Sequence, residues 1–189
     1  MPRMSHLYHE DQVYPVREDT LFLLEAALGE VRPGDRVLEV GTGSGYIAVE
    51  LMKITPHVIA TDINPHAVRI AREKGVEVVR TDLMAGLKGH FDLIVFNPPY
   101  LPTANEERID DWLERALDGG LSGRMVIERF AREIGGVLAK RGRTLILVSS
   151  LTNEEEVEKL FFHQGFCGKI VKKLSLEGEA LVIYRFCSW

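Results

Sequence analysis

Cysteine is scarce in this sequence: Cys167 and Cys187 are the only two copies. They form no C-x-x-C pair, and no histidine pair stands at ligand spacing near either of them. Structural zinc sites need four cysteine or histidine ligands at short spacings, so the sequence predicts no metal centre. A hairpin between the last two predicted strands would bring the cysteines together, but we interpret them as buried thiols.

Long apolar runs are also absent. No stretch reaches about 18 consecutive apolar residues, the length that spans a membrane. The first residues, 1–11, are polar and contain no apolar core, which is typical of neither a signal peptide nor a membrane anchor. These absences predict a cytoplasmic protein.

An excess of positive charge is the third absence. The net charge is −5 and the isoelectric point is about 5.7, which counts against a free-standing nucleic-acid-binding protein without excluding one. Hydrophobic residues make up 46% and charged residues 27% of the sequence, as in ordinary folded proteins. A chain of 189 residues suits one domain. We therefore predict a single domain over 1–189, of which 1–17 form an N-terminal extension.

The spacing of apolar residues predicts strands that alternate with helices. A helix is expected over 18–31, with Leu21, Leu24 and Leu28 in its apolar pattern, and a core-packing helix over 121–139. Strands are expected at 36–40, 58–63, 76–80, 91–96, 143–149, 169–176 and 180–186, with further helices at 46–53, after Asn64 and after Asn153. A three-residue link, 177–179, makes the last two strands an antiparallel hairpin.

This alternation predicts an α/β fold of the Rossmann-like, doubly wound kind. The first five strands would form a parallel sheet, and the hairpin would extend it to a seven-stranded, mostly parallel sheet with helices on both faces. Such a sheet binds ligands beyond the carboxyl ends of its strands. The residues that directly follow each strand are therefore the candidates for a functional site.

A glycine-rich loop, residues 39–45 with the sequence EVGTGSG, ends the first strand. Its glycines let the backbone turn sharply and approach a ligand closely. A dinucleotide fingerprint requires a glycine where Tyr46 stands, which weakens an interpretation as an NAD site. Glu39 would repel a pyrophosphate but attract a positively charged amino group. The loop therefore points to the aminoacyl end of S-adenosylmethionine.

Acidic residues follow the next two strands as well. Asp62 can accept hydrogen bonds from both ribose hydroxyls, although a solvated charge at a helix N-terminus is the alternative. Asp82 can accept the exocyclic amine of adenine while Leu83 covers the ring, although Asp82 alone could be a turn residue. Together with Glu39, these residues put a carboxylate at three strand ends, which favours a nucleoside cofactor.

The tetrapeptide Asn97-Pro98-Pro99-Tyr100 follows the fourth strand. An amide or aromatic amine nitrogen is a poor nucleophile because its lone pair is delocalised. The carbonyl groups of Asn97 and Pro98 can each accept one N–H, which localises the lone pair and directs it at a methyl donor. Neither proline has a competing N–H, and Tyr100 offers a flat surface for a planar group. The alternative is an ordinary turn after a strand.

These motifs resemble those of the HemK-type release-factor glutamine methyltransferases, in particular their short archaeal and eukaryotic branch. The stretch Val13–Thr20 and the segment Gly119–Arg124 share the resemblance, which covers nearly the entire chain. It implies S-adenosyl-L-methionine as cofactor and, as substrate, the glutamine of a Gly-Gly-Gln motif in a peptide-chain release factor, methylated on its side-chain nitrogen. It also implies a small zinc-binding activator subunit as partner.

The motifs and the resemblance together give a set of predicted site residues. The predicted catalytic residues are Asn97, Pro98, Pro99 and Tyr100. The predicted cofactor-binding residues are Thr20, Glu39, Gly41, Gly43, Gly45, Asp62, Ile63, Asp82, Leu83 and Asn97.

Two other functions stay open at this point. An N6-adenine DNA or N2-guanine RNA methyltransferase would use Asn97–Tyr100 on a nucleobase amine by the same chemistry, but the acidic balance and the absence of a target-recognition domain disfavour it. A non-catalytic S-adenosylmethionine-binding partner module is disfavoured by the intact tetrapeptide. Acidic residues at 106–114 predict a rim that contacts basic surface on a protein substrate, or else a solvated helix with Trp112 and Leu113 packed inward.

Overall fold

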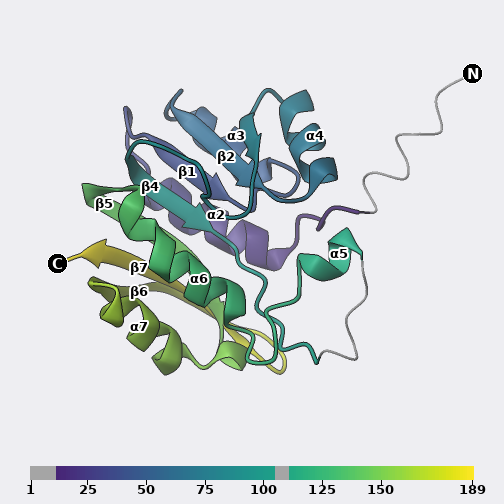
Figure 1. Cartoon of the computed structure of the whole chain (residues 1–189), viewed down its shortest axis with the longest axis vertical. Helices are drawn as coiled ribbons and strands as arrows, with labels where there is room; N and C mark the ends of the chain where they lie inside the picture. The colour runs from purple at the N-terminus through teal and green to yellow at the C-terminus, as the bar shows by residue number, and fades with distance from the viewer. Residues whose placement is uncertain (1–11, 105–110) are drawn as a thin grey trace, which may run out of the picture.

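The computed structural model describes residues 12–104 and 111–189. Its centre is a seven-stranded sheet with the strand order β3-β2-β1-β4-β5-β7-β6 (Figure 1). The strands are β1 (Val37–Val40), β2 (Val58–Asp62), β3 (Glu77–Arg80), β4 (Phe91–Phe96), β5 (Leu138–Ser149), β6 (Phe166–Ser175) and β7 (Ala180–Ser188). Neighbouring strands are parallel from β3 to β5, whereas β7 is antiparallel to both β5 and β6. The predicted mostly parallel sheet with a C-terminal hairpin is confirmed.

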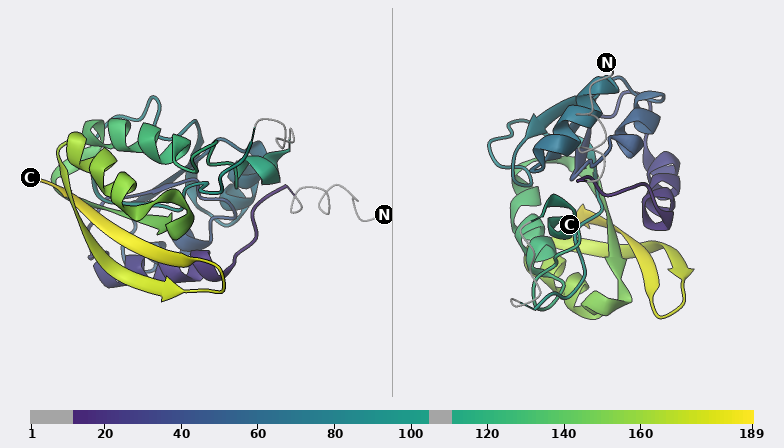
Figure 2. Two further views of the ribbon diagram at one scale, coloured as in Figure 1. Left: turned by 90° about the horizontal axis from the view of Figure 1, so that it is seen from below. Right: turned by 90° about the vertical axis from the view of Figure 1, so that its right-hand side faces the viewer.

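Helices cover both faces of this sheet (Figure 2). On one face lie α2 (Glu18–Glu30), α3 (Tyr46–Met52) and α4 (Pro65–Glu73), and on the other lie α6 (Met125–Glu133) and α7 (Glu154–His163). A short helix, α5 (Trp112–Arg115), follows β4. Among the helices of the described ranges, none has the length and apolar character that crossing a membrane requires.

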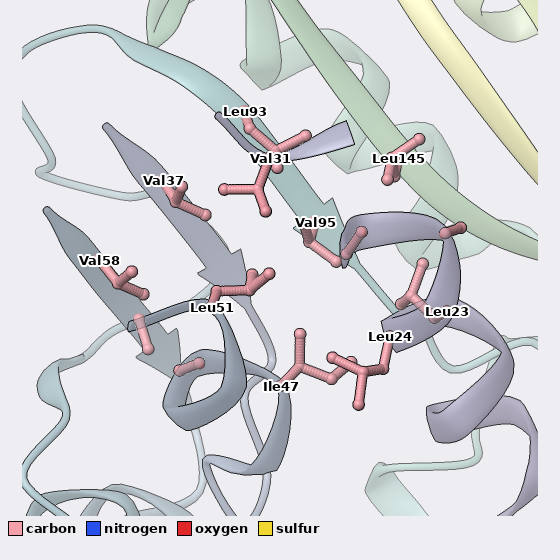
Figure 3. Close-up of a cluster of buried hydrophobic side chains, with 14 of the residues drawn as sticks. Leu23, Leu24, Val31, Val37, Ile47, Leu51, Val58, Leu93, Val95 and Leu145 are labelled. Carbon is pink, nitrogen blue, oxygen red and sulfur yellow. The ribbon is translucent and has the colours of Figure 1, made fainter. Parts of the chain in front are cut away.

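The apolar core between α2, α3 and the sheet explains why the central strands are apolar on both faces. Leu23 of α2 and Leu51 of α3 are fully buried and belong to the same apolar cluster as Val37 of β1 and Leu93 of β4 (Figure 3). All four residues of β1 are buried, because a second core under α6 and α7 covers the opposite face. The carboxylate of Glu39 is thus carried into a buried position by its own strand.

The core-packing helix expected over 121–139 is shorter than predicted. Helix α6 begins at Met125 and ends at Glu133, a 3-10 turn follows at Ile134–Gly136, and Leu138 already belongs to β5. Gly135 and Gly136 interrupt the helix because glycine is a poor helix former. Leu138 instead lies opposite Phe91 in the register of β5 with β4.

The apolar face of α2 also differs from the predicted pattern. Leu21 and Leu28 are exposed, whereas Leu23, Leu24 and Ala27 are buried against the sheet. The leucine spacing identified the helix correctly but assigned two of its residues to the wrong face, because Leu23 and Ala27 fit the same period equally well.

The interpretation of the cysteines as buried thiols is wrong. Cys167 and Cys187 lie directly opposite one another in the β6–β7 register, and both are free. Cys167 is exposed and Cys187 is half-buried. The hairpin brings the two residues together, as its predicted geometry implied.

A buried ion-pair network lies at the amino-end edge of the sheet, which we define as the side where Asp35, Asp92 and Arg143 lie. The Arg143 guanidinium pairs with Asp35 at 2.6 Å and with Glu30 at 3.3 Å, and it donates to the backbone carbonyls of Asp92 and Glu30. Arg185 also pairs with Glu30 at 2.8 Å. These contacts connect β5, β7 and the end of α2.

Candidate active site

A cavity of about 390 Å³ lies at the opposite, carboxyl-end edge of the sheet. It is bordered by the ends of β1, β2 and β4, by the segment after β3 and by the start of α2. The predicted site residues that line it are Thr20, Glu39, Gly41, Gly43, Asp62, Ile63, Asp82, Leu83, Asn97, Pro98, Pro99 and Tyr100. The structure therefore brings together every predicted site residue except Gly45.

The three positions of the loop require glycine for different structural reasons. All adopt positive φ, with values of 64° for Gly41, 54° for Gly43 and 76° for Gly45. A Cβ on Gly45 would lie 3.1 Å from Ala71, so this glycine lets α3 begin close against α4. Gly41 and Gly43 face the cavity instead. The prediction that Gly45 contacts the cofactor therefore has no support from its position.

Glu39 is a buried carboxylate that organises the glycine loop. It is 4% exposed, and its Oε2 atom accepts hydrogen bonds from the Thr42 hydroxyl at 2.5 Å and the Ala48 backbone N–H at 2.9 Å. Burial, with a further contribution from the nearby charge of Asp62, raises the pKa of Glu39 to about 8. Among the described residues, no cation pairs with this carboxylate. A positively charged group in the cavity would supply that missing partner.

Asp62 is held at the end of β2 by backbone donors. Its Oδ2 atom accepts from the Gly43 N–H and its Oδ1 atom from the Asn64 N–H, both at 2.8 Å. Burial raises its pKa, and these hydrogen bonds oppose that shift. Asn64 caps α4, the helix expected after it, by accepting from the His66 N–H at 2.9 Å. Asp62 is thus a buried part of the cavity wall, which argues against a solvated helix charge.

Asp82 has a partner that the sequence did not reveal. Its Oδ2 atom lies 2.7 Å from a guanidinium nitrogen of Arg129 on α6, and both side chains are more than two-fifths exposed. Leu83 beside it is buried and adopts a φ of 49°, which is unusual for a leucine. Arg129 lies 47 residues away along the chain and also lines the cavity. Any ligand contact of Asp82 is therefore made beside an arginine.

Asn97 at the end of β4 lines the cavity and carries an unused hydrogen-bond acceptor. Its Nδ2 group donates to Asp19 at 3.0 Å, whereas its Oδ1 atom is buried and receives no hydrogen bond from any described residue. A buried carbonyl oxygen without a donor is costly, and in a residue that lines a cavity it is a candidate partner for an N–H group of a ligand. Pro98 is buried and Tyr100 is half-buried beside it. Burial raises the pKa of the Tyr100 hydroxyl above its ordinary value, so the ring stays neutral.

The backbone that follows the tetrapeptide is fixed by the segment 117–123. The Leu101 N–H donates to the Leu117 carbonyl at 3.0 Å, and the Gly119 N–H donates back to the Leu101 carbonyl at 2.9 Å. A Cβ on Gly123 would lie 2.5 Å from the Tyr100 carbonyl oxygen, and the φ of Gly123 is 69°. Only glycine fits this position. Gly119 and Gly123 thus pack against the backbone of Tyr100 and Leu101, at the end of the tetrapeptide.

Asp19 at the start of α2 is the site residue that the predicted set missed. It is 5% exposed and contacts both Asn97 and Tyr14, whose hydroxyl donates to it at 3.2 Å. Its sequence signal was an acid in the first turn of a predicted helix, which is ordinarily a solvated charge. The predicted acidic rim at 106–114 lies partly outside the described residues. Within it, Asp111 caps α5 by accepting from the Leu113 N–H at 2.9 Å.

Comparison with known proteins shows which family the chain belongs to. The sequence model described as the methyltransferase small domain matches residues 17–167. The chain belongs to the methyltransferase small domain family. This methyltransferase is similar to a candidate protein N5-glutamine methyltransferase of Methanocaldococcus jannaschii. The two sequences are 38% identical, and the match covers 91% of this chain and 90% of that protein. Methyltransferase HEMK2 of Mus musculus is 37% identical over 92% of this chain and 89% of that protein.

A solved structure resembles this methyltransferase over nearly its whole length. The Mtq2 and Trm112 complex of E. cuniculi, described as responsible for the methylation of the eRF1 translation termination factor, contains a chain with 30% identity and a TM-score of 0.80. The match covers 94% of this chain and 99% of that chain. The resemblance predicted from the sequence motifs is therefore confirmed at the level of the family and the fold.

Proposed function

We propose that this methyltransferase transfers the methyl group of S-adenosyl-L-methionine to the side-chain nitrogen of the glutamine in a Gly-Gly-Gln motif of a peptide-chain release factor. The observation that carries the proposal is Asn97, which lines the cavity and whose buried Oδ1 atom has no hydrogen-bond donor among the described residues. It is an acceptor suited to one N–H of a planar amide. The names of the similar proteins, which concern glutamine methylation and a termination factor, support the same substrate.

The cavity fits the proposed cofactor in charge. Glu39 and Asp62 are buried carboxylates, and the described residues provide no cation for Glu39. The ammonium group of S-adenosylmethionine would face Glu39 and its ribose hydroxyls would donate to Asp62, with Gly41 and Gly43 allowing close approach of the loop. Ile63, 45% exposed at the cavity, offers an apolar surface for the adenine ring. When bound, the cofactor supplies an electrophilic methyl group.

The chain's own residues prepare the amide nitrogen. The Oδ1 atom of Asn97 and the carbonyl of Pro98 would accept the two N–H groups of the glutamine amide, so that the lone pair of its nitrogen is no longer shared with the amide carbonyl. These acceptors are strongest where positive charge develops on the nitrogen during transfer. Tyr100 would stack on the amide plane, and the absence of N–H groups on Pro98 and Pro99 leaves no donor to compete for the acceptors.

We include a small partner subunit in the proposal. The similar solved chain is in complex with Trm112, and a zinc-binding activator is what the sequence resemblance implied. The residues of this methyltransferase form no cluster of metal ligands within the described ranges, so zinc would belong to the partner. A release factor as substrate also agrees with the predicted cytoplasmic location.

Transfer of a labelled methyl group tests the proposed substrate. The recombinant protein, with and without the zinc-binding subunit, is incubated with labelled S-adenosylmethionine and a release factor, duplex DNA or structured RNA. We expect label on the release factor that disappears when its Gly-Gly-Gln glutamine is replaced by alanine. Label on nucleic acid alone would overturn the proposed substrate and favour a nucleobase methyltransferase.

A further inference from the structure

Asp19 has an unusual set of hydrogen-bond partners for an acid in the first turn of a helix. Its Oδ1 atom accepts from the Thr20 N–H at 2.7 Å and the Thr20 hydroxyl at 3.3 Å. Its Oδ2 atom accepts from the Tyr14 hydroxyl at 3.2 Å and from Asn97 Nδ2 at 3.0 Å. Both oxygens are thus used by donors from the chain itself, and the side chain is buried rather than solvated.

This arrangement determines which end of the Asn97 amide faces Asp19 and which end is left for another partner. The two ends of a side-chain amide have nearly the same shape, so packing alone does not distinguish the oxygen from the nitrogen. A carboxylate only accepts hydrogen bonds, so it attracts the Nδ2 group and repels the Oδ1 atom. Oδ1 must then point away from Asp19, which is consistent with its lack of any donor among the described residues. The orientation that the proposed chemistry needs is therefore imposed by a residue 78 positions away.

We propose that Asp19 is a positioning residue that acts through Asn97: its carboxylate holds the Asn97 amide so that Oδ1 is presented to the amide nitrogen of the substrate. This inference rests on the proposed function, because Asn97 is the acceptor in that chemistry. The negative charge of Asp19 also polarises the Asn97 amide and strengthens Oδ1 as an acceptor.

The variant Asp19→Asn tests this role with almost no change in side-chain volume. The new amide would place an NH₂ group among donors, and the Asn97 amide would turn to offer its oxygen to that group. We expect kcat for methyl transfer to the release factor to fall roughly 10- to 100-fold. The dissociation constant for S-adenosylhomocysteine and the KM for the release factor should change less than about threefold, because Asp19 contacts neither molecule in this role.

Tyr14→Phe is the matched control, because it removes the other hydrogen bond to the same Oδ2 atom. It leaves the contact between Asp19 and Asn97 in place, so its kcat should fall much less than that of Asp19→Asn. Equal losses in both variants would indicate a general structural role of this corner and would overturn the proposal. A large rise in the KM for the release factor, with kcat unchanged, would show direct substrate contact instead and would also overturn it.

A second measurement needs no substrate, so it remains decisive if the proposed function fails. The side-chain amide signals of Asn97 are assigned in ¹⁵N NMR spectra by their loss in Asn97→Ala. We expect these amide hydrogens to exchange slowly with water in the unmodified protein and at least tenfold faster in Asp19→Asn. Equal exchange rates would overturn the positioning role. Absence of transfer to the release factor by the unmodified protein would overturn the proposed substrate alone.

Discussion

The two edges of the sheet differ in whether their buried ionisable side chains have a partner of opposite charge. At the amino-end edge, Arg143 is buried and pairs with the carboxylates of Glu30 and Asp35. At the carboxyl-end edge, Glu39 and Asp62 are buried with hydrogen bonds from the chain but no salt bridge within the described residues. A balanced network of buried charges is consistent with a role in stability. An unbalanced one is consistent with a site whose missing charge arrives with a ligand.

The amino-end edge should be the most sensitive to loss of one charge. Arg143→Ala leaves the acidic groups of Glu30 and Asp35 in a buried position, although Arg185 still pairs with Glu30. Removing one partner of a buried ion pair costs about 3–5 kcal/mol, so we expect a loss of that size in the free energy of unfolding in urea. Lys53→Ala, which breaks an exposed pair with Glu50, is the control and should cost less than about 1 kcal/mol. Similar losses in the two variants would remove the contrast.

At the carboxyl-end edge, loss of one group should affect the reaction rather than stability. Asn97→Ala removes the proposed acceptor, and preorganised polar groups of this kind typically contribute about 100- to 1000-fold to the rate. We expect a loss of that order in labelled-methyl transfer, while the affinity for S-adenosylhomocysteine, measured by calorimetry, stays within a few-fold. Near-normal transfer by the variant would refute the catalytic role of Asn97.

The buried carboxyl group of Glu39 should make stability depend on pH. Its pKa is about 8 in the folded protein and near 4.5 in the unfolded chain, so the folded state holds the proton more tightly. The contribution of Glu39 to stability is therefore fully present below about pH 4.5 and is lost as the pH rises toward and through 8. Glu39→Gln has no proton to lose. We expect the melting temperature of the ligand-free variant to rise relative to that of the ligand-free unmodified protein as the pH increases from 5 through 7 to 9. A difference in melting temperature that stays constant with pH would contradict the raised pKa of Glu39.

The smallest effect is expected where the carboxyl-end edge does have an ion pair. The pair of Arg129 with Asp82 is well exposed, so Arg129→Ala should change the free energy of unfolding by less than about 1 kcal/mol. If Asp82 contacts adenine and Arg129 holds Asp82 in place, the affinity for S-adenosylhomocysteine should still fall a few-fold. Unchanged affinity in a calorimetric titration would mean that Arg129 does not position Asp82.

The sequence predicted those parts of the site that are local in the chain. Residues 39–45, Asp62 and Asn97 lie at or just after the ends of strands with clear apolar patterns, and parallel topology brings strand ends to one edge. Asp19 could not be assigned, because its partner Asn97 is distant in sequence and an acid at a helix start has an ordinary explanation. The contact of Gly123 with the Tyr100 carbonyl depends on tertiary packing in the same way.

The sequence predicted the fold correctly, and the two details that it misplaced have a related cause. The boundary between α6 and β5 was misplaced because Leu138 fits a helical period, whereas its register partner Phe91 in β4 decides its place in the sheet. The exposed leucines of α2 were misassigned because two apolar stripes share one helical period. In both cases, the deciding contact comes from another element.

Because Glu39 has no cationic partner among the described residues, a positively charged ligand that binds beside it should stabilise the folded protein. The cellular level of the protein should then depend on the concentration of that ligand. A ligand that binds only the folded state stabilises it by mass action, by about 2.7 kcal/mol when its free concentration is 100 times its dissociation constant. Cellular proteases degrade the unfolded population, so a shift of this size changes abundance several-fold. We therefore expect the steady-state level of the protein to follow the supply of its methyl donor.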